Sequence, residues 1–333
     1  YTHNWPYDEA AGNVPSTEVT LWSVMALLGL ILGLGAVLYA RGSTEDTYGR
    51  PGEDTQPFCT AERVAGFSPT PTQRATYKFF AVAAVLFLLQ VCAGLLTIHD
   101  FVKYTGIDLS AALPVTVTRS WHLQLALMWV ATCWIAASIF VLPLMSRTER
   151  KGQLSLVNLL FGVLVLVVGG TLLGTFLGPK GYLGPLWQLL GHQGWEFVEL
   201  GKLWQVLLFA GLILWAAIIM RGIAPCLKAR DRWSLPNWLL YSIVSVVLLF
   251  TSGFVARPET NFAIADFWRW CVIHMWVEAF LEVFTTVVVS YHLYLMGLVS
   301  ARSATRIVYL STLLFLGSGI LGISHNFYWI AKP

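Results

Sequence analysis

The sequence predicts an all-α membrane protein, a bundle of about eight transmembrane helices. The chain of 333 residues is 56% hydrophobic and only 12% charged, whereas soluble domains carry about 25% charged residues. Apolar runs of about 20 residues, the length that crosses a bilayer as a helix, recur along it. No segment alternates like a strand, and only helices and closed barrels can span a membrane.

Eight segments are apolar and long enough to be transmembrane helices. The first lies at 18–41 and is followed by a polar stretch rich in Pro and Thr at 42–77, which we expect to be a solvated cytoplasmic loop. The other seven segments lie at 78–98, 120–144, 154–177, 201–221, 237–255, 268–298 and 306–329. The segment at 268–298 is longer than one span, so we expect it to tilt or to project from the bilayer.

The distribution of Lys and Arg predicts the orientation. The loops after the first, third, fifth and seventh segments hold most of the 21 Lys and Arg residues, so these loops are expected in the cytoplasm. Both chain ends then face outward from a multi-pass protein of the inner (cytoplasmic) membrane. We expect one membrane catalytic domain over residues 1–333, part of a longer protein that continues on both sides. A net charge of +3 gives no indication of a nucleic-acid partner.

The seventh segment carries ionisable residues where lipid is expected. In WCVIHMWVEAFLEVF, the residues His274, Glu278 and Glu282 recur at four-residue steps, which brings them close to one helix face. A charge at the bilayer centre costs roughly 2.5–3.5 kcal/mol, so such residues usually face a cavity, a partner or a metal. His274 and Glu278 suit iron, with Glu282 as a proton relay or an electrostatic neighbour. The competing interpretation is a hydrogen-bonded polar stripe that holds helices together.

The last segment carries a second candidate ligand in GISHNFYW, where Asn326 follows His325. A lone histidine on an apolar helix is more often a satisfied core residue. If the last two segments pack as an antiparallel hairpin, however, His274 and His325 lie at similar depth near the outer ends of their helices. The sequence therefore predicts one metal centre formed by His274, Glu278 and His325, with Asn326 beside it.

A third histidine stands in RSWHLQLALMW, at the start of the third segment. His122 lies in the first turn, near the predicted outer surface, where a neutral imidazole suits an axial haem ligand. Arg119, three residues earlier, could pair with a haem propionate. An interfacial histidine without haem is the competing interpretation. An alternative function of a different class is a proton or cation transporter. Such a protein would use these polar residues as an ion path and would contain no haem.

Several stretches resemble one known family. They are YTHNWPYDEAAGNVP, TPTQRATYKFF, RSWHLQLALMWVATCWIAA, GHQGWEFVELGKLWQVLLFAGL, FWRWCVIHMWVEAFLEVF and GISHNFYW. Together they make nearly the whole chain similar to the catalytic part of quinol-dependent nitric oxide reductases, within the haem-copper oxidase superfamily. The resemblance implies an incomplete bundle of the kind found in subunit I of these oxidases.

The resemblance also implies roles for individual residues. His122 corresponds to an axial ligand of the low-spin haem b. Three residues correspond to ligands of a non-haem iron that faces a high-spin haem b: His274, Glu278 and His325. Glu282 corresponds to a second glutamate near that iron. Glu196 corresponds to a calcium ligand between the haem propionates, and Glu199 to a carboxylate linked to proton entry. Oxidases that reduce oxygen at copper typically carry Tyr at the position of Glu278, so the glutamate favours iron.

Two positions depart from the reductase pattern. Where the reductases have a second histidine, this chain has Asn326, whose neutral amide is a poorer iron ligand. In LLTIHDFVKYTGIDL, the quinol-site histidine remains as His99, but the expected glutamate is Lys103, which cannot accept a proton from quinol near neutral pH. We therefore do not expect quinol to bind productively.

Both departures make the chain similar to the nitric oxide dismutase branch, which converts two NO into N₂ and O₂ without an electron donor. A quinol-dependent reductase that makes N₂O is the alternative. The cofactors implied are haem b, high-spin haem b, non-haem iron and calcium. The remaining haem ligands of the family are expected after Pro333, so this chain alone is not expected to hold both haems.

Overall fold

The computed structural model describes residues 66–102, 106–191, 200–228, 234–255, 260–261 and 282–314, with residues 25, 28, 32 and 264. The chain divides into two compact units, Tyr1–Asp54 and Thr55–Pro333. The elements below belong to the second unit. Within the described ranges every regular element is helical, which confirms the predicted all-α class.

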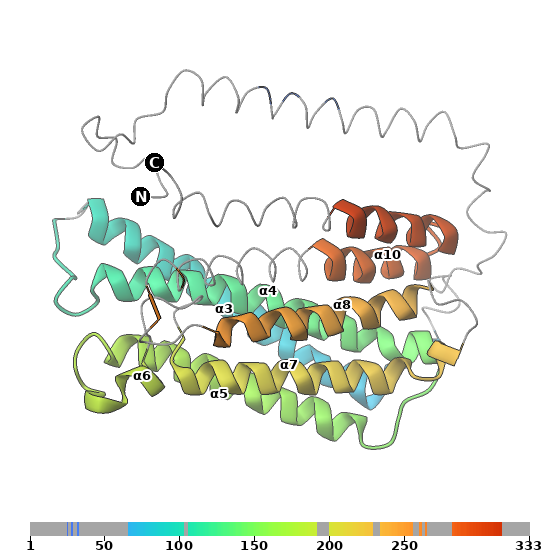
Figure 1. Cartoon of the computed structure of the whole chain (residues 1–333), viewed down its shortest axis with the longest axis horizontal. Helices are drawn as coiled ribbons and strands as arrows, with labels where there is room; N and C mark the ends of the chain where they lie inside the picture. Colours follow the sequence, from blue (N-terminus) through green and yellow to red (C-terminus); the bar gives the residue numbers. More distant parts are fainter. Residues whose placement is uncertain are drawn as a thin grey trace. The chain divides into compact units, whose positions relative to one another are not determined.

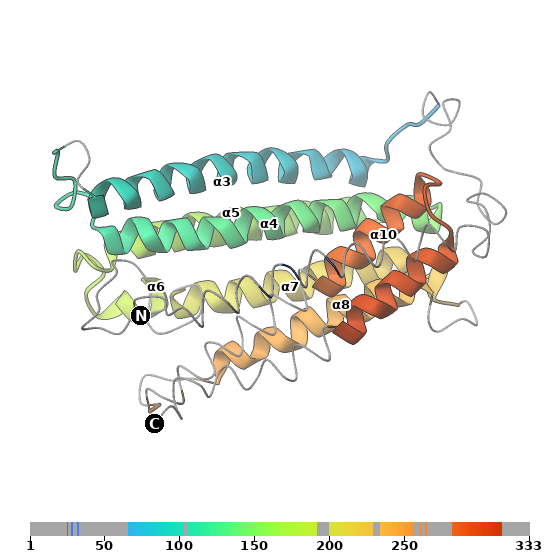
Figure 2. The same cartoon turned by 90° about the horizontal axis from the view of Figure 1, so that it is seen from above.

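Among the described residues, four helices are long and apolar enough to cross a membrane. They run alongside one another in both views (Figures 1 and 2) and comprise α3 (Pro71–Val102), α4 (Val115–Ser146), α5 (Gln153–Leu177) and α7 (Lys202–Ile223). These helices correspond to predicted segments two to five. Their outward faces carry large exposed apolar side chains such as Leu88, Leu95 and Leu173, as expected of surfaces that contact lipid.

Shorter elements complete the described part. The sixth predicted segment forms α8 (Leu235–Phe250), which a 3₁₀ turn (Thr251–Phe254) continues. The seventh is described only from residue 282 and contains α10 (Thr285–Leu295); the eighth is helical over 301–314. Of the first predicted segment, the structure describes three residues, and all three are helical. The remaining elements are η1 (Gly184–Leu186), α6 (Trp187–Leu190) and η3 (Cys226–Lys228).

The boundary of the predicted loop at 42–77 is wrong at its end, because α3 begins at Pro71. Proline at the first helical position has a preset φ and needs no hydrogen-bond acceptor. Thr70 and Gln73 form a capping box, in which the Thr70 N–H donates to Gln73 Oε1 (3.0 Å) and the Gln73 N–H donates to Thr70 Oγ1 (3.3 Å). Glu149 completes the cap by accepting from the Thr72 hydroxyl (2.6 Å) and backbone N–H (3.3 Å).

Buried polar side chains link the long helices. Gln153 of α5 donates to the backbone oxygen of Ile218 on α7 (2.8 Å), and Trp215 Nε1 of α7 donates to Ser138 Oγ on α4 (3.0 Å). An apolar helix surface packs about equally well against lipid and against another helix, so apolar contact alone does not select one arrangement. Close packing and hydrogen bonds between helices, each bond worth about 0.6–2 kcal/mol, favour one arrangement of membrane helices. Trp215 also packs edge-on against Phe284, with ring centroids 5.1 Å apart, which attaches the seventh segment to α7.

Candidate functional site

His122 lies near the start of α4 and faces α3. Its Nδ1 is 2.9 Å from the backbone oxygen of Gln90. The side-chain nitrogen of the same glutamine is 3.3 Å from both ring nitrogens. A carbonyl oxygen only accepts hydrogen bonds, so Nδ1 carries the proton and Nε2 keeps its lone pair.

A glycine on α3 makes room for this imidazole. A Cβ atom at Gly94 would lie 2.8 Å from His122 Cε1 and Nδ1, closer than real Cβ contacts. Gln90 and Gly94 are one helical turn apart, so they present one face of α3 to the ring. Together they form a seat for His122: one supplies the hydrogen-bond acceptor and the other the missing side chain.

The last two predicted segments lie against each other where the structure describes them. Ser311 Oγ of the eighth donates to the backbone oxygen of Glu282 (3.1 Å) and lies 3.3 Å from Thr286 Oγ1 of the seventh. These residues are on opposite sides of the connection between the segments, so the pairing agrees with the predicted antiparallel hairpin. Residues 282–284 form a π-helical turn before α10, a local irregularity often found near functional sites.

Comparison with known proteins identifies the family. Residues 74–333 match the family described as cytochrome c and quinol oxidase polypeptide I. The chain belongs to this family. It is also 25% identical over 264 residues to a nitric oxide reductase subunit of Stutzerimonas stutzeri, an alignment that covers 79% of this chain and 54% of that protein. The chain thus spans about half the length of this curated relative.

The oxidase polypeptide I match confirms the predicted superfamily and, with the helices described above, its all-α membrane architecture. The matched region begins within α3 and contains His122 with its seat, along with the whole of the last two segments. It leaves out the first predicted segment.

The residues around His122 fit a haem iron. Metal-bound histidines commonly donate their second ring N–H to a backbone carbonyl or a carboxylate, and His122 makes that bond to Gln90. The lone pair on Nε2 is the one an iron would take. The Gln90 side-chain amide can donate to Nε2 and would have to leave it when iron binds. Arg119 is exposed one turn earlier on α4, and its pairing with a propionate stays a prediction.

The predicted iron centre lies outside the described residues. His274, Glu278, His325 and Asn326 all belong to the undescribed part, as do Glu196, Glu199 and Lys103. Among the residues that the structure does describe, no group of three His, Cys, Asp or Glu could hold a metal ion. Glu282 is described and exposed, and His99 is half-buried near the end of α3. The iron, calcium and quinol-site assignments therefore remain predictions.

Sequence reasoning missed Gln90 and Gly94. A signal was present in QVCAG, where a polar residue and a glycine stand one turn apart in an otherwise apolar helix. Glycine inside a helix costs about 1 kcal/mol relative to alanine, and at Gly94 the close approach of the His122 ring accounts for that cost.

Proposed function

We propose that the complete protein is a membrane oxidoreductase that acts on nitric oxide at a paired haem and non-haem iron centre. The observation that carries the proposal is the family match over residues 74–333, together with a relative named as a nitric oxide reductase subunit. The glutamate at Glu278 supports iron over copper, because carboxylate and imidazole together suit iron. The proposed location is the inner membrane, with both chain ends outside.

The hairpin of the last two segments supports one shared iron site. If both helices continue with regular geometry from the pairing of Ser311 with Thr286, twelve residues toward His274 and fourteen toward His325 advance by similar distances, because each residue adds about 1.5 Å. The two imidazoles then reach a similar depth. His274, Glu278 and His325 would hold the iron. Glu282 would relay protons to this centre or act on it electrostatically as a neighbouring charge.

The other proposed groups have separate ligands. His122 would hold the low-spin haem b, Arg119 would pair with a haem propionate, and Glu196 would hold calcium. When bound, the two irons of the reactive centre would supply adjacent sites for two NO molecules. The chain's own residues would fix the histidine tautomers and keep carboxylate charge beside the centre.

We further propose that the reaction is dismutation. Two NO molecules contain the atoms of one N₂ and one O₂, so this conversion balances without electrons or protons. Reduction of two NO to N₂O and water instead consumes two electrons and two protons. Asn326 in place of a histidine and Lys103 in place of a glutamate both remove features that the reductase reaction uses. Quinol-dependent N₂O formation is the second candidate, favoured by the name of the relative.

The test uses the complete purified protein, ¹⁵N-labelled NO and mass spectrometry of the gases. Release of labelled N₂ together with O₂ in the absence of any electron donor supports dismutation. Labelled N₂O that accumulates only after quinol is added overturns it in favour of the reductase. A protein with no visible haem absorption would instead be a transporter or channel.

A further inference from the structure

Three basic side chains gather where two membrane-length helices end on the same side of the bundle. Arg150 and Lys151 lie in the turn just before α5 begins, and Arg221 lies in the last turn of α7. Arg221 Nη2 donates to the backbone oxygen of Lys151 (3.0 Å), so the two chain segments are in contact. All three side chains are exposed. We refer to Arg150, Lys151 and Arg221 as the basic cluster.

The protein itself holds the guanidinium of Arg221 in place. Besides the bond to Lys151, its Nε lies 3.5 Å from Gln153 Oε1. Gln153 is 3% exposed and donates from Nε2 to the backbone oxygen of Ile218 on α7 (2.8 Å), so this acceptor is itself fixed. Two of the five guanidinium N–H donors are thereby used. Within the described ranges the other three have no acceptor, and a fixed guanidinium with open donors suits a phosphate group.

The charge of the cluster favours an anion. In the part of the chain that the structure describes, the side chains of Arg150 and Lys151 make no hydrogen bond or ion pair. Glu149 is the carboxylate beside them in the sequence, and its two oxygens accept from Thr72 of α3 (2.6 and 3.3 Å). Three positive charges thus stand beside one carboxylate that is engaged elsewhere. Such an excess attracts a negatively charged partner.

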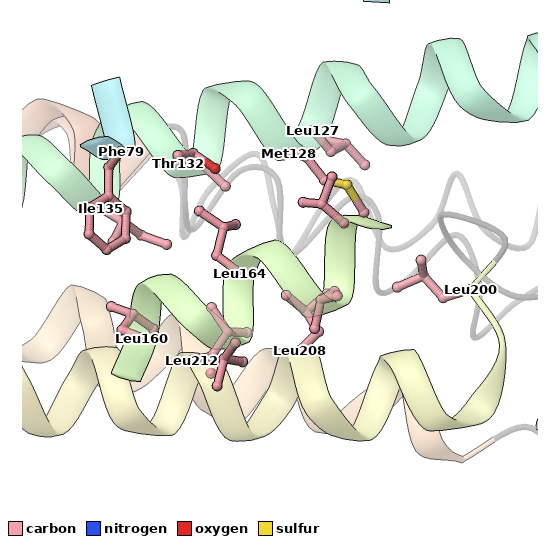
Figure 3. A pocket seen from close by; sticks show the side chains of 15 residues that line it. Phe79, Leu127, Met128, Thr132, Ile135, Leu160, Leu164, Leu200, Leu208 and Leu212 are labelled. Atoms are coloured by element: carbon pink, nitrogen blue, oxygen red, sulfur yellow. The ribbon is translucent and has the colours of Figure 1, made fainter. Parts of the chain in front are cut away.

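The outward faces of α5 and α7 next to the cluster are apolar. Figure 3 shows side chains of both helices that line the space inside the bundle: Leu160 and Leu164 of α5, and Leu208 and Leu212 of α7. Leu159 and Leu166 of α5 are instead 57% and 53% exposed, and Ile213 of α7 is 47% exposed. Leu159 and Ile213 each lie eight residues from the cluster, about 12 Å along their helices. Exposed apolar surface therefore continues from the cations into the span.

We propose that the basic cluster binds one anionic phospholipid, with its phosphate at Arg221 and Lys151 and its acyl chains along the exposed faces of α5 and α7. The cations lie at the ends of both spans, which is the level of lipid headgroups, and the apolar side chains lie at acyl depth. Basic sites between membrane helices bind anionic headgroups in this way. A soluble phosphate would make no use of the apolar faces. The proposal does not depend on the reaction of the complete protein.

The test is native mass spectrometry of the complete protein in detergent, titrated with phosphatidylglycerol or with zwitterionic phosphatidylcholine. The variants are Lys151→Gln and the double variant Arg150→Gln with Lys151→Gln. Arg221 is left unchanged because it also joins α5 to α7. Arg302→Gln is the matched control, since it removes one exposed positive charge on another helix, within 301–314.

The expected result is tighter binding of phosphatidylglycerol than of phosphatidylcholine. Each basic side chain near a membrane surface contributes enough for about fivefold in affinity, so Lys151→Gln should weaken phosphatidylglycerol binding about fivefold and the double variant about 25-fold. The Arg302→Gln protein should bind it like the original. Equal binding of the two lipids, no weakening in the variants, or equal weakening in the control overturns the proposal.

Thermal unfolding separates a lipid from other anions. A ligand that binds only the folded protein raises the unfolding midpoint, so phosphatidylglycerol should raise it for the original protein and much less for the double variant. Without lipid the two proteins should unfold alike. Glycerol phosphate, the soluble part of the headgroup, should have little effect, and equal stabilisation by it overturns the lipid assignment. An acidic protein that is retained by the original and lost from the double variant, while both bind phosphatidylglycerol alike, overturns it in favour of protein docking.

Discussion

The imidazole of His122 donates a hydrogen bond from Nδ1 to the backbone oxygen of Gln90, 2.9 Å away on the neighbouring helix. The acceptor belongs to the main chain, so the bond survives any side-chain change at residue 90. The Gln90 side chain has a separate role, because its nitrogen lies 3.3 Å from Nε2, where it would compete with the proposed haem iron. The two roles can be separated by mutation.

Replacing Gln90 with Leu should slow the loss of low-spin haem from the complete protein. The carbonyl that fixes the tautomer remains, and the competing amide is gone. An ordinary hydrogen bond is worth about 0.5–1.5 kcal/mol, so we expect haem release to slow by about two- to tenfold. Absorption spectroscopy with a haem acceptor measures this rate. The control is Leu88→Ala, on the lipid-facing side of α3, and faster release in Gln90→Leu would contradict the prediction.

Replacing Gly94 with Ala should disturb the same haem by another route. The new Cβ would lie 2.8 Å from the His122 ring, so the ring must move. We expect altered low-spin haem signals in electron paramagnetic resonance, with partial loss of haem. Gly169→Ala is the matched control, because a Cβ there meets nothing within 4 Å. Identical spectra in both variants would show that Gly94 does not seat the ring.

Replacing Glu149 with Ala should destabilise the bundle without changing its spectra. Glu149 accepts from the hydroxyl and the N–H of Thr72 at the start of α3, and Thr72 is only 1% exposed. Leaving such buried donors unpaired costs about 1–3 kcal/mol. Thermal unfolding in detergent, followed by circular dichroism, should show a lower midpoint. Arg150→Ala, at an exposed neighbour, should unfold like the original, and an equal decrease in both variants would refute the cap.

Replacing Asn326 with His tests the proposed departure from the reductases. The variant should gain an imidazole ligand at the non-haem iron, because imidazole binds iron better than a neutral amide does. We expect changed metal spectra and a lower yield of O₂ from NO. Unchanged metal spectra would count against Asn326 lying at the metal. Asn261→His, outside the predicted centre, provides a control for the added imidazole.

Helix positions were largely predictable from local composition. The fourth segment was expected at 154–177 and is Gln153–Leu177; the fifth was expected at 201–221 and is Lys202–Ile223. Hydropathy determines such segments because bilayer solvation acts on each run of residues separately. The start of α3 was missed because it depends on a capping box in a polar stretch, and on Glu149 far away in the chain.

By itself, the sequence determined which segments are helical, the family to which the chain belongs and which histidines are candidate ligands, because these depend on local residue patterns. Only the tertiary structure decided that Gln90 and Gly94 seat His122 and that Ser311 pairs with Glu282. These relationships join residues on different helices. They arise from how side chains of particular size and polarity pack together, which no local pattern contains.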